Sequence, residues 1–307
     1  MPAASLRALL AQSIDYAGLF PPCSLDLETA LKNHAQYVRS ADNWMLGAFI
    51  LPVEKFEGAA ASFSQFDHKH PLRISALGPK AENAKDFRGA LQSTVAAIKS
   101  FAAQHVDLVA INQLEMALPE NVDLALLTET DAMFGEMKLN VFWETPADAA
   151  EETIALLAQH HKKNPRVFGY KLRTGGVTAD AFPLSTQIAT ALIAATRHHV
   201  PIKFTAGLHH PVHQFRKEVE TKMHGFLNVL GAGVLVAEHD WDERQTIEML
   251  EDEDAASFSF EDTVFAWRDW EVAIDRIKAR RKFVTSFGSC SFDEPREDLR
   301  ALGLLPS

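Results

Sequence analysis

The chain has 307 residues, 47% of them hydrophobic, and carries a formal net charge of −11 at pH 7. This composition suits one large globular core, and the acidic balance, with only a short cationic run at 278–282, argues against nucleic acid as a partner. The two cysteines, Cys23 and Cys290, are too few for a disulfide framework and agree with a reducing cytoplasm. No secretion signal or long apolar run is evident, so we expect neither secretion nor membrane insertion.

Hydrophobic periodicity divides most of the chain into alternating helices and strands. Helices are predicted over 5–12 and 25–40, with a short strand or rigid loop at 15–23 between them. Strands are then predicted at 44–51, 72–77, 107–114, 139–144, 166–172 and 201–206. The helices that separate them are predicted at 54–66, 83–104, 121–136, 147–163 and 180–198. Because a helix separates each strand from the next, the strands should run parallel in an α/β fold.

Polar residues recur where these strands end, and this favours a closed barrel over an open doubly wound sheet. They are Asn112, Glu115, Glu144, Thr145, Lys171, Arg173, Lys203, His209 and His210. In a barrel the carboxyl ends of all strands ring one opening, whereas an open sheet gathers its ligand at one switch point. No Gly-x-Gly-x-x-Gly follows the early strands, so the main dinucleotide signal is missing. We therefore predict a (β/α)8 barrel of the TIM type.

The pattern becomes less regular after His210. Helices are predicted over 214–237, 241–252 and 264–282, with a short strand at 257–260. Only seven or eight strands can be counted, so the barrel is expected to be irregular in its last units. The chain is interpreted as a single domain over 1–307, in which 240–307 forms a helical C-terminal extension or lid.

Two lysines lie inside predicted apolar strands and indicate a functional site. Lys171 shares one face of its strand with Arg173, and Lys203 shares one face of the next strand with Thr205, because side chains alternate along a strand. Buried cations are costly unless they are paired, deprotonated or bound to an anion. Exposure on edge strands is the alternative, which the apolar flanking residues disfavour. Desolvation and the second cation are expected to lower the pKa of the amine and allow attack on a carbonyl.

The same two stretches resemble class I aldolases of the deoxyribose-phosphate aldolase kind. The matching strings are Lys171-Leu-Arg-Thr-Gly175 and Lys203-Phe-Thr-Ala-Gly207. The resemblance implies that Lys171 forms the Schiff base and that Lys203 tunes it. Those aldolases also carry an aspartate near the end of an earlier strand, whereas Asp107 stands at the beginning of its strand here. Glu144 or Glu115 is therefore the expected acid or base.

The chain as a whole also resembles a bacterial family of uncharacterised TIM-barrel-like proteins. The shared strings are Asp15-Tyr-Ala-Gly-Leu-Phe20, Lys171-Leu-Arg-Thr-Gly-Gly176 and Gly207-Leu-His-His-Pro211. This resemblance implies no activity.

A guanidinium followed by two glycines suits the binding of a carboxylate or phosphate. Arg173 can bind an oxyanion with two parallel hydrogen bonds, and Gly175 and Gly176 let backbone amides approach it. Alternatively, the glycines only form the turn before an N-cap at Thr178. The predicted substrate-binding residues are Arg173, Thr174, Gly175, Gly176, Asn112, Glu115, Thr205, His209 and His210.

Metal-assisted chemistry is the rival hypothesis. One histidine of the 209–210 pair could join Glu115, Glu144 and a histidine at 224 or 239 as ligands. Lys171 or Lys203 would then act as a base or as the electrostatic stabiliser of an enolate. No His-x-His or His-Glu-x-x-His lies beside the strand ends, so no metal ligand is assigned, although a divalent metal is possible. Cys290 is interpreted as inert filler rather than a nucleophile, within a segment at 283–295 that packs over the opening.

The sequence thus predicts an aldolase-type lyase that acts on a small anionic carbonyl compound through a Schiff base, with Lys171, Lys203 and Glu144 as catalytic residues. The alternatives are a metal-dependent isomerase, lyase or hydrolase, and a barrel that only binds a small molecule. A catalytic protein is favoured because a simple anion-binding site does not need Glu144 nearby. No feature of the sequence indicates an oligomeric state.

Overall fold

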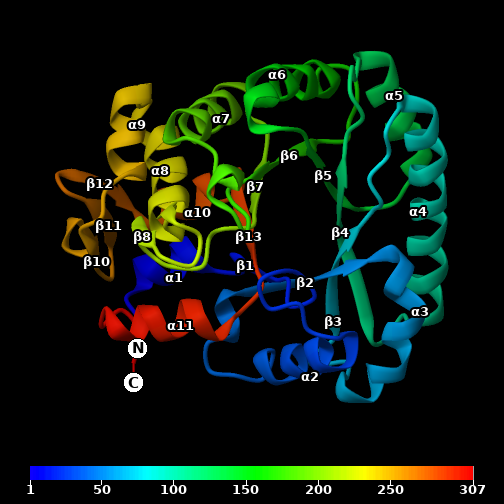
Figure 1. Ribbon diagram of the computed structural model, residues 1–307, viewed down its shortest axis with the longest axis horizontal. Coiled ribbons are helices and arrows are strands. Elements are labelled where there is room, and N and C mark those ends of the chain that lie inside the picture. Colours follow the sequence, from blue (N-terminus) through cyan, green and yellow to red (C-terminus); the bar gives the residue numbers. More distant parts are fainter. Residues whose placement is uncertain (307) are drawn as a thin grey trace.

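The computed structural model describes residues 1–306 and contains a closed barrel of eight parallel strands (Figure 1). Around the barrel the order is β1, β13, β7, β6, β5, β4, β3 and β2. Their bounds are β1 (Ile14–Tyr16), β2 (Leu46–Pro52), β3 (Leu72–Leu77), β4 (Val109–Ala117), β5 (Asn140–Glu144), β6 (Phe168–Arg173), β7 (Ile202–Thr205) and β13 (Val284–Ser289). The prediction of a (β/α)8 barrel is confirmed.

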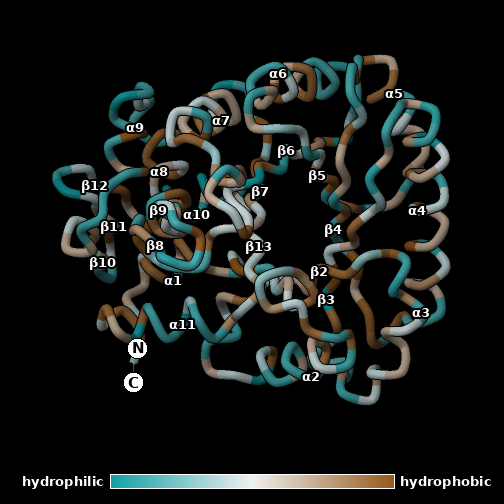
Figure 2. Tube along the Cα trace, viewed as in Figure 1, coloured by the Kyte–Doolittle hydropathy of each residue, from teal (hydrophilic) through white to brown (hydrophobic). Residues whose placement is uncertain are grey.

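Helices surround the barrel and cover its strands from outside, which explains why the outward-facing strand residues are apolar. The helices are α1 (Ala4–Leu10), α2 (Leu27–Tyr37), α3 (Phe56–Ala59), α4 (Ala84–Gln104), α5 (Leu124–Phe134), α6 (Ala150–His161), α7 (Ser185–His198), α8 (Phe226–His239), α9 (Glu243–Leu250), α10 (Ile274–Arg280) and α11 (Asp293–Ala301). Figure 2 shows hydrophobic residues along inner strands such as β4, and hydrophilic residues on outer helices such as α11. No helix among residues 1–306 has the length and apolar character needed to cross a membrane.

Local sequence determines where several helices begin. The Asn83 side chain accepts hydrogen bonds from the backbone N–H groups of Lys85 and Asp86, both at 3.0 Å, at the start of α4. Asp123 caps α5 in the same way, and Asp242 forms a capping box with Gln245 before α9. These side chains satisfy backbone donors that have no partner within the helix.

Two predicted helices in the last third of the chain are wrong. The stretch 214–237 begins with an antiparallel hairpin, β8 (Gln214–Arg216) and β9 (Thr221–Met223), and only then enters α8. The stretch 264–282 begins with β11 (Val264–Trp267) and β12 (Trp270–Ala273), which form an antiparallel sheet with β10 (Phe258–Phe260) before α10. Aromatic and β-branched residues in β11 and β12 favour strands, and their side chains pack against the rest of the molecule.

The segment 240–307 is more than an extension or lid, because its strand β13 pairs with β1 and β7 and closes the barrel. The remainder of this segment does depart from a regular barrel unit, with α9, the three-stranded sheet and α10 preceding β13. Helix α11 follows β13 and lies beside the opening at the carboxyl ends of the strands. Residues from both ends of the chain therefore contribute to the same rim.

Candidate active site

Strand register brings the predicted charged residues into the barrel. Lys171 on β6 pairs with Glu144 on β5 and with Lys203 on β7. Residues directly opposite one another in a parallel sheet point to the same face, so all three side chains point inward. Glu115 lies two residues before Ala117, which is the partner of Glu144, and therefore shares this inner face.

These residues form a continuous series of alternating charges, which we call the ion chain. It consists of Asp15, Lys203, Glu115, Lys171, Glu144 and Arg173, in this order. The distances between successive charged atoms are 2.8 Å from Asp15 Oδ2 to Lys203 Nζ, 2.5 Å from Lys203 Nζ to Glu115 Oε1, 2.9 Å from Glu115 Oε2 to Lys171 Nζ, 2.9 Å from Lys171 Nζ to Glu144 Oε2 and 3.4 Å from Glu144 Oε1 to Arg173 Nε. Three carboxylates thus alternate with three cations.

The ion chain runs from the interior of the barrel to its opening. The side chains of Asp15, Lys203 and Glu115 are 0% exposed, that of Lys171 is 5% exposed, and those of Glu144 and Arg173 are 20% and 54% exposed. Lys171 is therefore the first lysine that a molecule entering from the opening meets. Lys203 lies behind it.

Neutral groups hold the inner end of the ion chain. Lys203 Nζ donates to Gln113 Oε1 at 2.8 Å, and Ser75 Oγ donates to Glu115 Oε1 at 2.5 Å. Asp15 accepts hydrogen bonds from the Ala48 backbone N–H and from Ser286 Oγ, both at 2.6 Å. Buried charges need such partners, because an unpaired one is strongly unfavourable inside a protein.

Mutual pairing determines the protonation of the buried charges. Burial alone would raise the pKa of Glu115, but Lys171 and Lys203 lower it to about 2. Burial likewise opposes charge on both lysines, yet the carboxylates override it. Glu115 and Glu144 raise the pKa of Lys171, and Asp15 and Glu115 raise that of Lys203. The expectation of a lowered lysine pKa was therefore wrong for the protein without substrate, because each lysine sits between two carboxylates rather than beside a bare cation.

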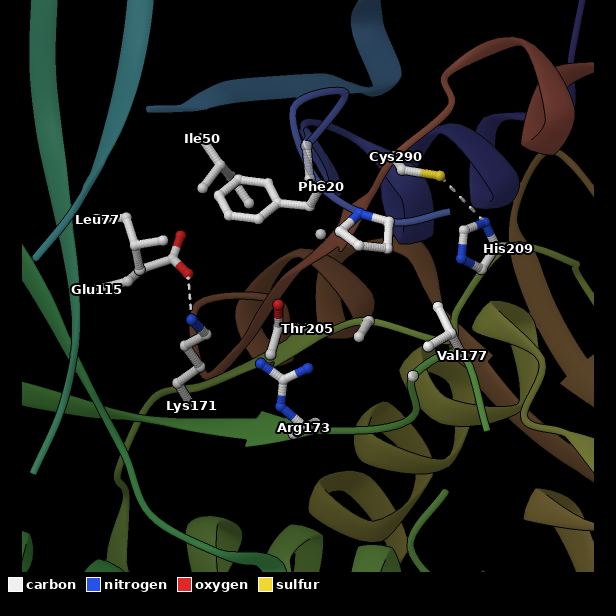
Figure 3. Close-up of a pocket in the computed structure, with 15 residues that line it drawn as sticks. Phe20, Ile50, Leu77, Glu115, Lys171, Arg173, Val177, Thr205, His209 and Cys290 are labelled. Atoms are coloured by element: carbon white, nitrogen blue, oxygen red, sulfur yellow. Dashed lines mark hydrogen bonds and ion pairs between the residues drawn. The ribbon is translucent and has the colours of Figure 1, made fainter. Parts of the chain in front are cut away.

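A cavity of about 290 Å³ opens above the ion chain (Figure 3). Lys171 and Arg173 line one side, and Phe20 and Ile50 lie across the cavity from them. Leu77 and Glu115, which are paired between β3 and β4, line the cavity side by side. Thr205, His209 and Cys290 complete the polar wall. This volume suits a small molecule.

Arg173 also lines a second hollow, of about 530 Å³, together with Glu144 and Thr145. The Arg173 guanidinium thus stands between the two spaces, and Figure 3 shows it close to Thr205 and Lys171. Lys171, Arg173, Glu144 and Lys203, which we expected to share one cavity at the carboxyl rim, all belong to the ion chain. Of these four, only Lys171 and Arg173 line the smaller cavity.

The stretch after Arg173 supports the backbone. Thr174 is fully buried, and its hydroxyl donates to the backbone carbonyl of Ala206 at 2.6 Å. A Cβ on Gly175 would lie 2.8 Å from the Cα of Gly207, so these two turns pack too closely for side chains. Gly207 also has a φ of +76°, which glycine adopts readily. Gly176 lines the cavity, whereas Thr174 and Gly175 hold the ends of β6 and β7 together.

The adjacent histidines contact acidic residues of α11. His209 Nδ1 lies 3.0 Å from Glu294 Oε2, and His210 Nδ1 lies 2.6 Å from Asp298 Oδ2. His209 lines the cavity, while His210 is buried beside it. Only His209 is therefore placed to contact a ligand there.

The structure does not bring Asn112 to this site. Its side chain is exposed, and the pairing of β4 with β3 skips a residue at this point, since Ile111 pairs with Ile74 and Gln113 with Ser75. Such a bulge reverses which face each later side chain occupies. Asp107 is exposed in the turn before β4, at the opposite end of the strand from the cavity.

Sequence reasoning missed Asp15, Ser75 and Gln113 as members of the site. Asp15 could have been recognised as a site residue from the sequence, because it is an isolated carboxylate between apolar residues of a three-residue strand. Ser75 and Gln113 become recognisable only when the register of β3 and β4 is known.

The described residues of the site do not form an evident set of metal ligands. Residues 1–306 contain no group of three or more His, Cys, Asp or Glu side chains placed to hold a metal ion. The site carboxylates contact lysine ammonium groups instead. No family model matches the chain, and no curated protein matches it either.

Proposed function

We propose that this protein is an aldolase-type carbon–carbon lyase that acts on a small anionic carbonyl compound through an imine on Lys171. The observation that carries the proposal is the position of the Lys171 amine at the floor of the cavity, 2.9 Å from both Glu115 and Glu144. Lys203 is less suited to this role, because it is fully buried behind Glu115. The resemblance to class I aldolases points to the same lysine.

Arg173 is the proposed anchor for the anionic group of the substrate. It is the most exposed member of the ion chain, and a guanidinium binds carboxylate or phosphate with two parallel hydrogen bonds. When an anion draws Arg173 away from Glu144, Lys171 remains the cation in contact with that carboxylate. Glu144 then takes a proton from Lys171, which leaves a free amine in the presence of substrate. Glu115 is the poorer acceptor, because the two lysines hold its pKa at about 2.

The amine of Lys171 attacks the substrate carbonyl carbon, and the carbonyl oxygen takes the proton from Glu144. Loss of water gives a protonated imine, which withdraws electrons from the neighbouring carbon–carbon bond. In the cleavage direction a hydroxyl proton of the substrate passes to Glu144, the bond breaks, an aldehyde leaves and an enamine stays on Lys171. Protonation of the enamine and addition of water then release the second product.

The cavity volume of about 290 Å³ and the apolar wall of Phe20, Ile50 and Leu77 suit a short carbon skeleton with one charged end. With two cysteines in 307 residues and an acidic composition, we also propose a cytoplasmic location.

Imine trapping tests this function directly. The purified protein is incubated with cyanoborohydride and, in turn, glyoxylate, pyruvate and glycolaldehyde phosphate, and its peptides are analysed by mass spectrometry. We expect a substrate-sized adduct on the peptide that contains Lys171, no adduct in Lys171→Met, and no effect of a chelator. An adduct elsewhere, or catalysis that a chelator abolishes and a divalent ion restores, would assign the reaction to metal chemistry or to another lysine. Binding of these compounds without adduct or turnover would leave only the ligand-binding alternative.

A further inference from the structure

The only two cysteines of the chain come together at the rim of the cavity. Cys23 and Cys290 are 267 positions apart in sequence, yet their Sγ atoms lie 3.0 Å apart. Both are free thiols, Cys23 exposed and Cys290 buried. The contact places two free thiols within reach of each other at the edge of the cavity.

The pair connects two neighbouring segments of the cavity wall. Cys23 belongs to the loop 17–26 between β1 and α2, and this loop contributes Phe20 and Pro21 to the cavity. Cys290 directly follows β13 and lines the cavity itself (Figure 3). The two segments are already joined by the backbone hydrogen bond from Ala17 N–H to the Ser289 carbonyl, at 2.7 Å. A second, covalent link would fix the outer part of the loop as well.

We propose that Cys23 and Cys290 are a redox modification site, at which a reversible disulfide fixes the loop 17–26 to the end of β13 and restricts entry to the cavity. The oxidant is a peroxide. The chemistry does not depend on the reaction of the site, but its effect on turnover rests on the proposed function.

The different environments of the two thiols assign their roles. Cys23 faces solvent and can meet a peroxide, whereas Cys290 is sheltered. Burial, and then the contact with Cys23, raises the pKa of Cys290 to about 12. The thiolate is the reactive form of cysteine, so Cys23 reacts first and Cys290 resolves the product.

The steps are balanced. The Cys23 sulfur attacks one peroxide oxygen, an S–O bond forms, the O–O bond breaks and water leaves, which gives a sulfenic acid. The Cys290 sulfur then displaces the hydroxyl group, an S–S bond forms, and a second water carries away the Cys290 proton. Two thiols lose two electrons and one peroxide is reduced to two waters. A cellular thiol reverses the bond by exchange through the exposed Cys23 sulfur.

Mass spectrometry and hydrogen exchange on the full chain test this proposal without an activity assay. After treatment with hydrogen peroxide we expect a mass loss of about 2 Da, a linked pair of peptides that contain Cys23 and Cys290, and reversal by dithiothreitol. Backbone amides of 17–26 should exchange at least several-fold more slowly in the oxidised form. Cys23→Ser is the matched control, because this exposed residue does not line the cavity and its replacement should leave the fold and the imine trapping rate unchanged.

The functional arm compares imine trapping on Lys171 in reduced and oxidised protein. Oxidation should slow it at least several-fold in the wild type and not in Cys23→Ser. Oxygen added to Cys23 while Cys290 stays titratable would overturn the proposal, as would disulfide-linked dimers or protection of both thiols by Zn²⁺. An internal disulfide without any change in exchange at 17–26 would also overturn it. Failure of imine trapping in every form, with the disulfide and slowed exchange present, would refute only the proposed function.

Discussion

Lys203 Nζ lies 2.8 Å from Asp15 Oδ2, and both side chains are completely buried between β1 and β7. This pair anchors the inner end of the ion chain. The charged residues that raise the pKa of Lys203 are Asp15 and Glu115. The position of Lys203, and through Glu115 that of Lys171, therefore depends on Asp15.

Asp15→Asn should be strongly destabilising, because it leaves a buried ammonium group with half of its compensating charge. Breaking a buried pair typically costs about 3–5 kcal/mol. Urea unfolding followed by circular dichroism measures this loss. Asp275→Asn is the matched control, since its 3.6 Å contact with Lys278 is almost fully exposed, and its cost should stay below about 1 kcal/mol. Equal effects of the two changes would show that the Asp15 charge is not required.

Stability should fall in acid as Glu115 gains a proton. Its folded pKa of about 2 lies below its ordinary value of 4.5, so it contributes stability above pH 4.5 that is lost as the pH falls through about 2. The difference corresponds to roughly 3 kcal/mol for this fully buried group. Both buried lysines have raised pKa values, so their contribution is present below pH 10.5 and is lost as the pH rises through those values.

Unfolding free energies measured between pH 2 and pH 6, in wild type and Glu115→Gln, separate this contribution from that of other carboxylates. The variant should be less stable at pH 6 and should lose less stability on acidification. Parallel curves for the two proteins would mean that Glu115 does not titrate as its contacts with the lysines require.

Glu144→Gln should shift imine formation to lower pH. Burial opposes charge on Lys171, and Glu115 and Glu144 together raise its pKa, so removal of one carboxylate lowers it and increases the fraction of free amine. The rate of cyanoborohydride trapping with glyoxylate, measured from pH 6 to pH 10, should begin to rise at lower pH in the variant. Its maximum and the turnover should both fall, because Glu144 no longer carries the proton between Lys171 and the carbonyl oxygen. Glu152→Gln on α6 is the exposed control and should match the wild type. An unshifted profile in Glu144→Gln would remove Glu144 from this role.

Arg173→Lys should weaken anion binding more than its retained charge suggests, because the planar fork of hydrogen-bond donors is lost. We expect the affinity for inorganic phosphate or pyruvate, measured by calorimetry, to fall roughly tenfold. Arg197→Lys changes an exposed arginine on α7 and serves as the control. An unchanged affinity would leave Arg173 with the structural role of pairing with Glu144.

The regular part of the fold could be predicted from the sequence because each strand and each helix has its own hydrophobic periodicity. β3 occupies the predicted 72–77, and β6 and β7 begin and end within two residues of the predictions. The helix predicted over 264–282 was wrong because β11 and β12 derive their stability from contacts with remote residues, such as Trp241 against Trp267. Local periodicity does not contain such information.

The site was predictable only as far as strand position determines it. Lys171, Lys203 and Glu144 could be found because they lie within or at the end of apolar strands, and alternation gives the face that each side chain occupies. The prediction that Asn112 lies at the site failed because the bulge in β4 shifts the alternation of side chains by one residue. The prediction of a lowered lysine pKa failed for another reason. The sequence shows that cations converge, but not that Glu115 lies between the two lysines within 2.9 Å of each.

Lys203→Met tests how the two lysines cooperate. In the wild type, Glu115 is shared between Lys203 and Lys171. Without Lys203 its full charge acts on Lys171, and the loss of a nearby cation acts in the same direction, so the pKa of Lys171 rises further. Turnover and imine trapping should fall at neutral pH and partly recover as the pH is raised. Lys171→Met should be inactive at every pH, because the amine itself is missing. If Lys203→Met keeps the wild-type pH profile, the two lysines act independently, and Lys203 only maintains the charge balance of the core.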